Sequence, residues 1–234
     1  MKNWDGSPFS RSLKTENRPP FYPMFADLHG RACVVVGGGL VAQRKVTTLL
    51  TYGAMITVVS PTVTRRLARY ATQRRIRYVA RTFRPTDLKS AWLVYAATND
   101  ERINESVFRT AQRDRIFTNV VDQKPLCSFI APAILRRGDL VVAFSTGGAS
   151  PTVSKLLRRD LMATIGKDYA RLVRLLGGLR GIAKQRLPNY NDRKRYFNRL
   201  VQGPVFRLVR EGRTSAARHE ALDLLAHAAA RRHA

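Results

Sequence analysis

A run of three glycines, Gly37-Gly38-Gly39, is the first feature of the sequence that could do chemistry. From residue 37 to residue 42 the chain reads G-x-G-x-x-A, directly after a short apolar run and before residues with helical spacing. In that setting the first glycine makes a tight turn, the second lets a pyrophosphate approach the backbone, and the small last residue lets helix and strand pack closely. Free N–H groups at the helix start would hold the phosphate charge. The motif predicts a dinucleotide site; a tight turn without a ligand is the alternative.

The residues that would meet the ribose of a dinucleotide follow the next apolar run. An acid belongs about 20 residues after the glycines, where it would bind the ribose 2′-hydroxyl. Ser60-Pro61-Thr62 occupy that place instead. Ser60 or Thr62 could bind a ribose, but neither excludes a 2′-phosphate as a carboxylate would, and Arg65 and Arg66 lie close by. These residues leave the choice between NAD and NADP open.

An aspartate follows the last of the apolar runs, in the segment Asn119-Val120-Val121-Asp122. Ligands of open parallel sheets bind outside the carboxyl ends of the strands. A carboxylate at that edge can accept a proton while a nicotinamide takes a hydride. An ordinary loop aspartate or a helix cap is the alternative interpretation.

A second small-residue loop, Ser145-Thr146-Gly147-Gly148-Ala149-Ser150-Pro151, precedes another segment with helical character. Ser150 suits the N-cap position and Pro151 the first helical position. Capping alone would account for the loop. The functional interpretation adds backbone and hydroxyl donors for anionic groups.

The elements that must position these residues follow from the hydrophobic pattern. We expect strands over 32–36, 55–59, 77–80, 92–97 and 116–121, and helices over 41–52, 64–73 and 101–113. This alternation predicts right-handed βαβ units and a Rossmann-type parallel sheet, hence an α/β fold. A hairpin with its turn near residues 137–139 leaves this order, and the chain is then helical from Ser150, with breaks at Gly177-Gly178 and Pro188.

The composition is strongly basic. The 234 residues include 42 Lys+Arg and 16 Asp+Glu, a formal net charge of +26, and 44% are hydrophobic. That hydrophobic content supports a packed core and excludes a disordered basic chain as the whole protein. The charge predicts an anionic partner: nucleic acid, a membrane surface or a small polyanion. Eight arginines between residues 65 and 84 have few aromatic neighbours, so we interpret them as a solvated face and do not expect nucleic acid.

Several classes of protein are excluded by what the sequence lacks. No apolar run is long enough to span a bilayer, and the first twenty residues lack the apolar region of a signal peptide, so we expect a cytoplasmic protein without membrane contact. Cys33 and Cys127 offer neither a disulfide framework nor a CxxC metal pair. The four histidines have no metal-ligand spacing, and we expect no metal site.

These motifs together resemble the precorrin-2 dehydrogenase / sirohydrochlorin ferrochelatase family, the dehydrogenase module of sirohaem synthase. Residues 37–45 resemble its VGGGxVAxRK signature. AATND at 96–100, NVVD at 119–122, SFIAPAI at 128–134 and STGGASP at 145–151 follow in the family's order. Each stretch alone is weak evidence for the family, but the five stretches in the same order make the resemblance specific.

The resemblance covers roughly residues 21–180 and implies a function. A homodimer would oxidise precorrin-2 to sirohydrochlorin, with NAD as the hydride acceptor. One alternative is a bifunctional enzyme that also inserts Fe2+ into sirohydrochlorin. A more distant one is a nucleotide-sensing or nucleic-acid-binding protein on a Rossmann scaffold. No methyltransferase module follows, so the resemblance implies a stand-alone enzyme that receives precorrin-2 from elsewhere.

The resemblance also assigns roles to residues. Asp122 would be catalytic, and Thr146 stands where the family has a loop serine. The remaining candidates fall into two groups. Cofactor contacts are expected at Gly37, Gly38, Gly39, Leu40, Val41, Ser60, Pro61, Thr62 and Thr98. Substrate contacts are expected at Asn119, Ser128, Ser145, Thr146 and Gly147.

The expected organisation has four parts. Residues 1–20 would form a flexible arm and 21–124 the NAD-binding Rossmann domain. Residues 125–165 would form a dimerisation region and 166–234 a helical, basic C-terminal domain. The most basic part of that last segment has no counterpart in the resemblance, and its role stays open.

Overall fold

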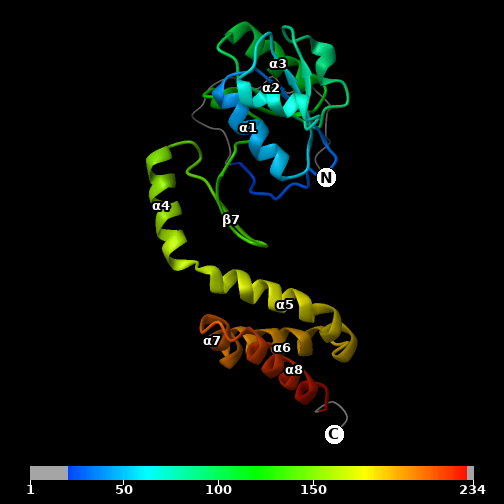
Figure 1. The fold of residues 1–234 in the computed structure, drawn as a ribbon, viewed down its shortest axis with the longest axis vertical. Coiled ribbons are helices and arrows are strands. Elements are labelled where there is room, and N and C mark those ends of the chain that lie inside the picture. The colour runs from blue at the N-terminus through cyan, green and yellow to red at the C-terminus, as the bar shows by residue number, and fades with distance from the viewer. Residues whose placement is uncertain (1–20, 231–234) are drawn as a thin grey trace, which may run out of the picture. The chain divides into compact units, whose positions relative to one another are not determined.

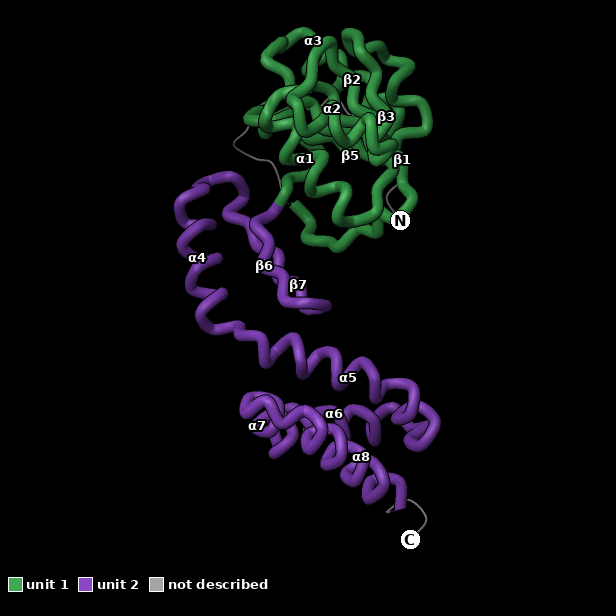
Figure 2. Tube along the Cα trace, in the orientation of Figure 1, with its two compact units in different colours: residues 1–131 green, residues 132–234 purple. Residues whose placement is uncertain are grey.

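The computed structural model describes residues 21–230, so the expected flexible arm at 1–20 lies outside the described residues. Two compact units, residues 1–131 and 132–234, make up the chain (Figure 2). The predicted boundaries at 124/125 and 165/166 stay predictions.

The first unit is built on a five-stranded parallel sheet with the order β3-β2-β1-β4-β5. The strands are β1 (Ala32–Val36), β2 (Met55–Val59), β3 (Arg77–Val79), β4 (Leu93–Ala96) and β5 (Phe117–Val120). They lie within two residues of the predicted bounds. The chain runs outward from β1 to β3, then returns to the other side of β1 for β4 and β5. The order therefore reverses between β1 and β4, and the Rossmann-type fold is confirmed.

Three helices connect the strands, and local signals set their ends. They are α1 (Leu40–Thr51), α2 (Arg65–Thr72) and α3 (Glu101–Arg113); two short 3-10 turns are η2 (Pro85–Leu88) and η3 (Lys124–Leu126). The Thr64 hydroxyl accepts from the Leu67 N–H at the start of α2, and the Asp100 carboxylate accepts from two N–H groups of α3. Gly53, with a φ of +70°, ends α1 as predicted.

Both faces of this sheet are buried, which explains why its strands read as apolar runs rather than alternating ones. On one face Val35 and Val58 pack against α1 and α2 through Val46 and Leu67. On the other, Val94 and its neighbours pack against α3. Burial raises the pKa of the Cys33 thiol to about 11, which makes this cysteine an inert part of the core.

The second unit begins with the predicted antiparallel hairpin. Its strands are β6 (Ala133–Arg137) and β7 (Leu140–Phe144), joined by a turn in which Gly138 has a φ of +59°. Five helices follow (Figure 1): α4 (Pro151–Thr164), α5 (Lys167–Arg186), α6 (Tyr190–Gln202), α7 (Pro204–Arg210) and α8 (Thr214–Ala230). The last four share an apolar core. Within residues 21–230, no helix has the length and apolar character that crossing a bilayer requires.

The predicted break at Gly177-Gly178 is wrong, because α5 runs without interruption from Lys167 to Arg186. Each glycine costs a helix about 1 kcal/mol relative to alanine. Leu179, which directly follows the glycines, and Ala183, one turn beyond Leu179, are fully buried in the helical core, and that burial outweighs the glycine penalty. The second predicted break, at Pro188, is confirmed, since α5 ends at Arg186.

Candidate functional site

The glycine loop lies where the order of the sheet reverses, between the carboxyl ends of β1 and β4. Gly37 has a φ of +120°, which side chains other than glycine rarely allow. A Cβ on Gly37 would stand 2.3 Å from the carbonyl oxygen of Ala97, directly after β4. Only glycine lets the two loops pass each other here, which is the turn role that the motif predicted.

Gly38 brings the loop after β2 against the glycine loop. The carbonyl of Gly38 accepts from the Thr64 N–H at 3.0 Å, and a Cβ on Gly38 would stand 1.8 Å from the Thr62 carbonyl oxygen. Ser60 is buried beneath this contact, whereas Pro61 and Thr62 are exposed. The predicted ribose residues are therefore brought together with the glycines, with Pro61 and Thr62 reaching the surface.

Gly39 leaves space in front of the first helix. It is the N-cap residue of α1 and has no side chain that could cap the helix, and no heavy atom lies within 4 Å of the place a Cβ would occupy. The first turn of α1 carries no acid, and the Leu40 side chain is 70% exposed. Free N–H groups at an open helix N-terminus attract phosphate, so these residues fit the pyrophosphate of a dinucleotide.

Thr98, predicted as a cofactor contact, shapes the loop after β4. Its hydroxyl accepts from the Asp100 N–H at 3.0 Å, and its carbonyl accepts from the buried Asn104 amide at 3.0 Å. These bonds hold the turn into α3. The side chain thus lies at the correct edge of the sheet but is already engaged with its own loop.

Asp122 stands on a backbone turn just past β5. The Val121 N–H donates to the Ala96 carbonyl at 2.9 Å, and Asp122 then takes a φ of +60°, which is uncommon outside glycine. The residue is exposed, and it caps no helix, because Gln123 is the N-cap residue of η3. The capping interpretation of Asp122 is therefore wrong. Backbone in this conformation is often found at functional sites.

The loop that presents Asp122 is tied back onto β5 by side chains. The Asn119 amide donates to the Phe129 carbonyl at 3.0 Å, and the Ser128 hydroxyl accepts from the Thr118 N–H at 2.7 Å. The Cys127 thiol lies 3.2 Å from the Val120 carbonyl oxygen. The hydrogen bonds of Asn119 and Ser128 therefore fix the loop that carries Asp122 against β5. Their contact with a substrate stays a prediction.

Lys45 joins this edge of the sheet and was not assigned a role from the sequence. Its Nζ lies 4.8 Å from the centroid of the Tyr95 ring. Burial lowers the pKa of Lys45, as does the charge of Arg44, while the negative charge of Asp122 acts in the opposite direction. Two signals in the sequence pointed to it: Lys45 is the last residue of the VGGGxVAxRK resemblance, and its spacing of four residues from Val41 places both residues on one flank of α1.

The predicted substrate loop at residues 145–147 belongs to the second unit. The Ser145 hydroxyl accepts from the Gly147 N–H at 3.0 Å, and the Thr146 hydroxyl accepts from the Ser150 N–H at 3.2 Å. Ser150 caps α4 as predicted, accepting from the Val153 N–H. Capping is thus confirmed, and anion binding by this loop stays a prediction.

The arginine-rich segment makes separate local contacts. Arg66 donates to the Tyr70 hydroxyl, Arg75 lies over the same ring at 4.9 Å, and Arg81 forms an ion pair with Asp87 at 2.6 Å. Within residues 21–230, no three His, Cys, Asp or Glu side chains gather closely enough to hold a metal ion.

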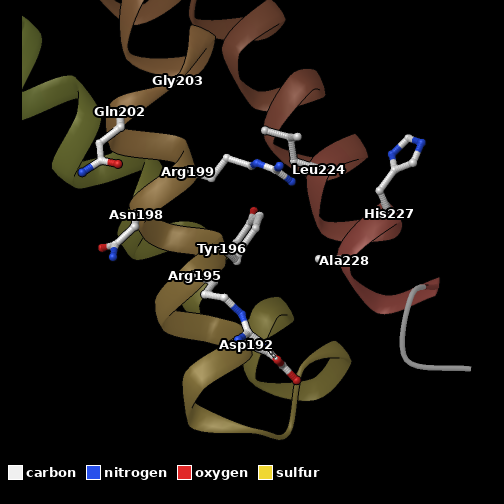
Figure 3. A pocket seen from close by; sticks show the side chains of 10 residues that line it. All are labelled: Asp192, Arg195, Tyr196, Asn198, Arg199, Gln202, Gly203, Leu224, His227 and Ala228. Atoms are coloured by element: carbon white, nitrogen blue, oxygen red, sulfur yellow. Dashed lines mark hydrogen bonds and ion pairs between the residues drawn. The ribbon is translucent and has the colours of Figure 1, made fainter.

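A cavity of about 760 Å³ lies elsewhere, between α6 and α8 of the helical unit (Figure 3). Arg195 and Arg199 line it, with Arg195 paired to Asp192 at 2.6 Å. Tyr196 is buried beside it, and its hydroxyl donates to the Ala221 carbonyl. None of the residues predicted from the sequence lines this cavity.

Comparison with known proteins identifies both units. Residues 24–133 match the family described as "Putative NAD(P)-binding", and residues 168–225 match the sirohaem synthase dimerisation region. A siroheme synthase of Nitrosospira multiformis is 43% identical over 202 residues, which are 85% of this chain and 43% of that protein. The chain belongs to the precorrin-2 dehydrogenase / sirohaem synthase family.

Other members of this family give a consistent picture. A siroheme synthase of Thioalkalivibrio sulfidiphilus is 43% identical over 198 residues, covering 85% of this chain and 40% of that protein. The solved structure "SirC, precorrin-2 dehydrogenase" matches with a TM-score of 0.73 and 26% identity, covering 88% of this chain and all of that one. This chain spans about two fifths of the length of the curated siroheme synthases that it matches.

The family match refines the view of the second unit. The sirohaem synthase dimerisation region at 168–225 spans α5, α6, α7 and most of α8. The dimerisation region predicted at residues 125–165 stays a prediction. The first unit is the nicotinamide-dinucleotide-binding domain of this family.

Proposed function

We propose that this chain is a precorrin-2 dehydrogenase, which oxidises precorrin-2 to sirohydrochlorin with NAD+ as the oxidant. One observation carries the proposal: an open glycine loop and an exposed carboxylate lie at the same edge of the sheet, next to the point where the strand order reverses. The likeness to a precorrin-2 dehydrogenase structure over its entire length supports the same activity.

The nucleotide would lie across the carboxyl edge of β1 and β2. The first turn of α1 and Gly39 would hold its pyrophosphate, and Pro61 and Thr62 its adenosine ribose. When bound, NAD+ accepts the hydride that leaves the substrate. The loop after β2 offers hydroxyls rather than a carboxylate, and we assign NAD over NADP on the strength of the family alone.

Asp122 would receive the proton that the macrocycle loses as the hydride departs. Its carboxylate is exposed at the end of β5, and no ion pair within residues 21–230 includes it. A carboxylate held on a rigid turn can act as a general base without first breaking a contact. The hydrogen bonds of Asn119 and Ser128 keep that turn in place.

The substrate class matches the charge of the chain. Precorrin-2 and sirohydrochlorin carry many carboxylates, and a net charge of +26 would steer such molecules toward the protein. Ser145, Thr146 and Gly147 would supply further donors for these carboxylates. We assign the enzyme to the cytoplasm and to a homodimer.

A direct assay tests the proposal. Purified protein is mixed with precorrin-2 and NAD+, and the absorbance of NADH is followed as sirohydrochlorin forms. We expect NADH and sirohydrochlorin to appear in equal amounts. If neither forms, although the protein binds NAD+, the proposed function is wrong.

Iron insertion is the second candidate, because the curated relatives carry the name siroheme synthase and sirohaem contains iron. Fe2+ would then be a substrate alongside sirohydrochlorin. Formation of sirohaem from sirohydrochlorin and Fe2+, measured with and without protein, decides this question. A rate equal to the uncatalysed one would exclude the second activity.

A further inference from the structure

A half-buried lysine lies on the flank of the first helix, beside the candidate site. Ala42, Val46 and Leu49 of α1 are buried against the sheet, and Lys45 stands beside this buried face. Its Nζ is 4.8 Å from the centroid of the Tyr95 ring. The lysine therefore lies along the sheet rather than extending into solvent.

The neighbours of Lys45 place it at the edge where Asp122 stands. Tyr95 is next to the last residue of β4 and pairs with Asn119 of β5, so the two side chains share one face of the sheet. Phe129 packs edge-on against Tyr95 at 5.3 Å, and the same residue's carbonyl accepts from Asn119. Asp122 follows Asn119 by three residues, just past the end of β5, so Lys45 and Asp122 stand at the same edge of the sheet.

Among residues 21–230, no carboxylate lies within ion-pair distance of the Lys45 ammonium group. The Tyr95 ring offers a cation–π contact, which is a weak substitute for an anion. A partly buried ammonium group without an anion is costly, and such groups concentrate at functional sites.

We propose that Lys45 binds a carboxylate of the tetrapyrrole substrate and holds the macrocycle beside Asp122. The inference rests on the proposed function and deepens it by assigning a substrate-binding residue. The dinucleotide pyrophosphate is another possible anion, but the first turn of α1 already suits it. Lys45 lies five residues after Leu40, the first residue of α1, or about 7.5 Å along the helix axis, on the flank that faces Tyr95.

Binding measurements separate these anions. Lys45→Met, Lys45→Arg and wild type are titrated with sirohydrochlorin without nucleotide, and separately with NADH, following ligand absorbance or fluorescence. Lys45→Met should weaken sirohydrochlorin binding about ten- to a hundredfold, as expected for the loss of a charge-assisted hydrogen bond, and leave NADH binding unchanged. Lys45→Arg should recover most of the affinity. In turnover assays, Lys45→Met should raise the KM for precorrin-2 more than it lowers kcat.

A matched control comes from Lys89, an exposed lysine at the end of η2 in the same unit. Lys89→Met removes the same charge and should change neither binding constant. Thermal unfolding of each variant identifies loss of folding. If Lys45→Met does not fold, Lys45→Gln serves in its place.

Two results would overturn the inference. One is wild-type affinity for sirohydrochlorin in a folded Lys45→Met or Lys45→Gln variant; the other is a loss of NADH affinity instead, which would assign Lys45 to the pyrophosphate. Failure of the proposed function looks different. Wild-type protein would then form no NADH from precorrin-2, whatever its affinity for sirohydrochlorin.

Discussion

At the scale of single residues, the three glycines of the loop have different physical roles. Gly37 and Gly38 are required by backbone contacts, whereas Gly39 borders open space. The two kinds of glycine should respond differently to a methyl group. A methyl group on Gly37 or Gly38 should affect the stability of the fold, whereas a methyl group on Gly39 should affect the binding of the dinucleotide.

We predict that Gly38→Ala destabilises the protein and that Gly39→Ala weakens dinucleotide binding. A methyl on Gly38 would stand 1.8 Å from the Thr62 carbonyl oxygen, so the loops must separate. A methyl on Gly39 meets nothing in the protein but occupies the approach of the pyrophosphate, and its cost to the helix end stays below about 1 kcal/mol. Thermal unfolding and NADH titration of both variants check this. Equal melting temperatures would contradict the prediction for Gly38.

Asp122 allows a test that preserves its turn. Asparagine tolerates the left-handed backbone of this residue, so Asp122→Asn should keep the fold and NADH affinity. It removes the proton acceptor, and kcat for NADH formation should fall about 10²- to 10⁴-fold. Steady-state kinetics beside an NADH titration provide the measurement. A kcat close to wild type would remove Asp122 from the mechanism.

At the scale of elements, α5 shows packing overriding a local sequence signal. Gly177 and Gly178 are exposed in its interior, and a Cβ on either would meet nothing within 4 Å. Glycine is therefore not needed there for close approach.

We predict that Gly177→Ala and Gly178→Ala each stabilise the protein by about 0.5–1 kcal/mol, because alanine loses less backbone entropy in a helix. Urea unfolding monitored by circular dichroism measures the change. Gly203→Ala is the contrasting control, because its Cβ would stand 2.6 Å from the Arg199 carbonyl oxygen and should destabilise. Destabilisation by both α5 substitutions would mean that the two glycines have a role in packing.

The ion pair between Arg81 and Asp87 ties η2 to the segment after β3. The guanidinium donates to both carboxylate oxygens, at 2.8 and 2.6 Å, and the Arg84 N–H donates a third bond. The hydrogen bonds from Arg81 hold the pKa of Asp87 below its ordinary value, and burial opposes them. A lowered pKa in the folded state means that the carboxylate stabilises the fold above its unfolded pKa.

Asp87→Asn should therefore cost about 1–2 kcal/mol at neutral pH. The difference from wild type should shrink as the pH falls below about 4, where the unfolded carboxyl becomes protonated and the folded one follows at lower pH. Urea unfolding of both proteins at a series of pH values tests the sign. A difference that grows on acidification would contradict it.

At the scale of the whole molecule, one helix is left with an uncovered apolar surface. None of the 14 residues of α4 is buried in the single chain, and Leu156 and Leu157 are 46% and 41% exposed. Exposed apolar surface of this kind is typical of protein–protein contacts. The family match to a dimerisation region adds a reason to expect a partner copy.

We predict a homodimer of twice the 26.4 kDa chain mass, with α4 in its interface. Replacing both Leu156 and Leu157 by aspartate should shift the protein toward monomer, because burying charge in an apolar interface is unfavourable. Light scattering after size exclusion measures the mass. Thr152→Asp, an exposed substitution on the same helix, should leave the dimer intact. A dimer that survives the double substitution would place the interface elsewhere.

The charge of the chain is also a property of the whole molecule. Residues 151–234 hold 19 Lys+Arg against 6 Asp+Glu, so half of the net charge of +26 lies in the last third of the sequence. The proposed tetrapyrrole substrate, which is anionic, would account for the charge of Lys45 beside the sheet. The proposed substrate does not explain the excess positive charge of residues 151–234.

The sequence by itself determined the sheet, the glycine turn, the hairpin and the helix caps. Each depends on signals a few residues long: apolar runs for strands buried on both faces, Gly53 and Gly138 at left-handed turns, and Ser150 before Pro151. Such signals act through the backbone of their own segment, so they can be read without knowing what packs against it.

Tertiary structure alone decided the rest. The helix α5 continues across Gly177-Gly178, because residues distant in sequence bury Leu179 and Ala183 beside the two glycines. Tertiary structure used Asn119 and Ser128 to support the Asp122 turn and brought Lys45 over Tyr95. These contacts join segments ten to fifty residues apart, and only the packed sheet specifies which side chains meet there.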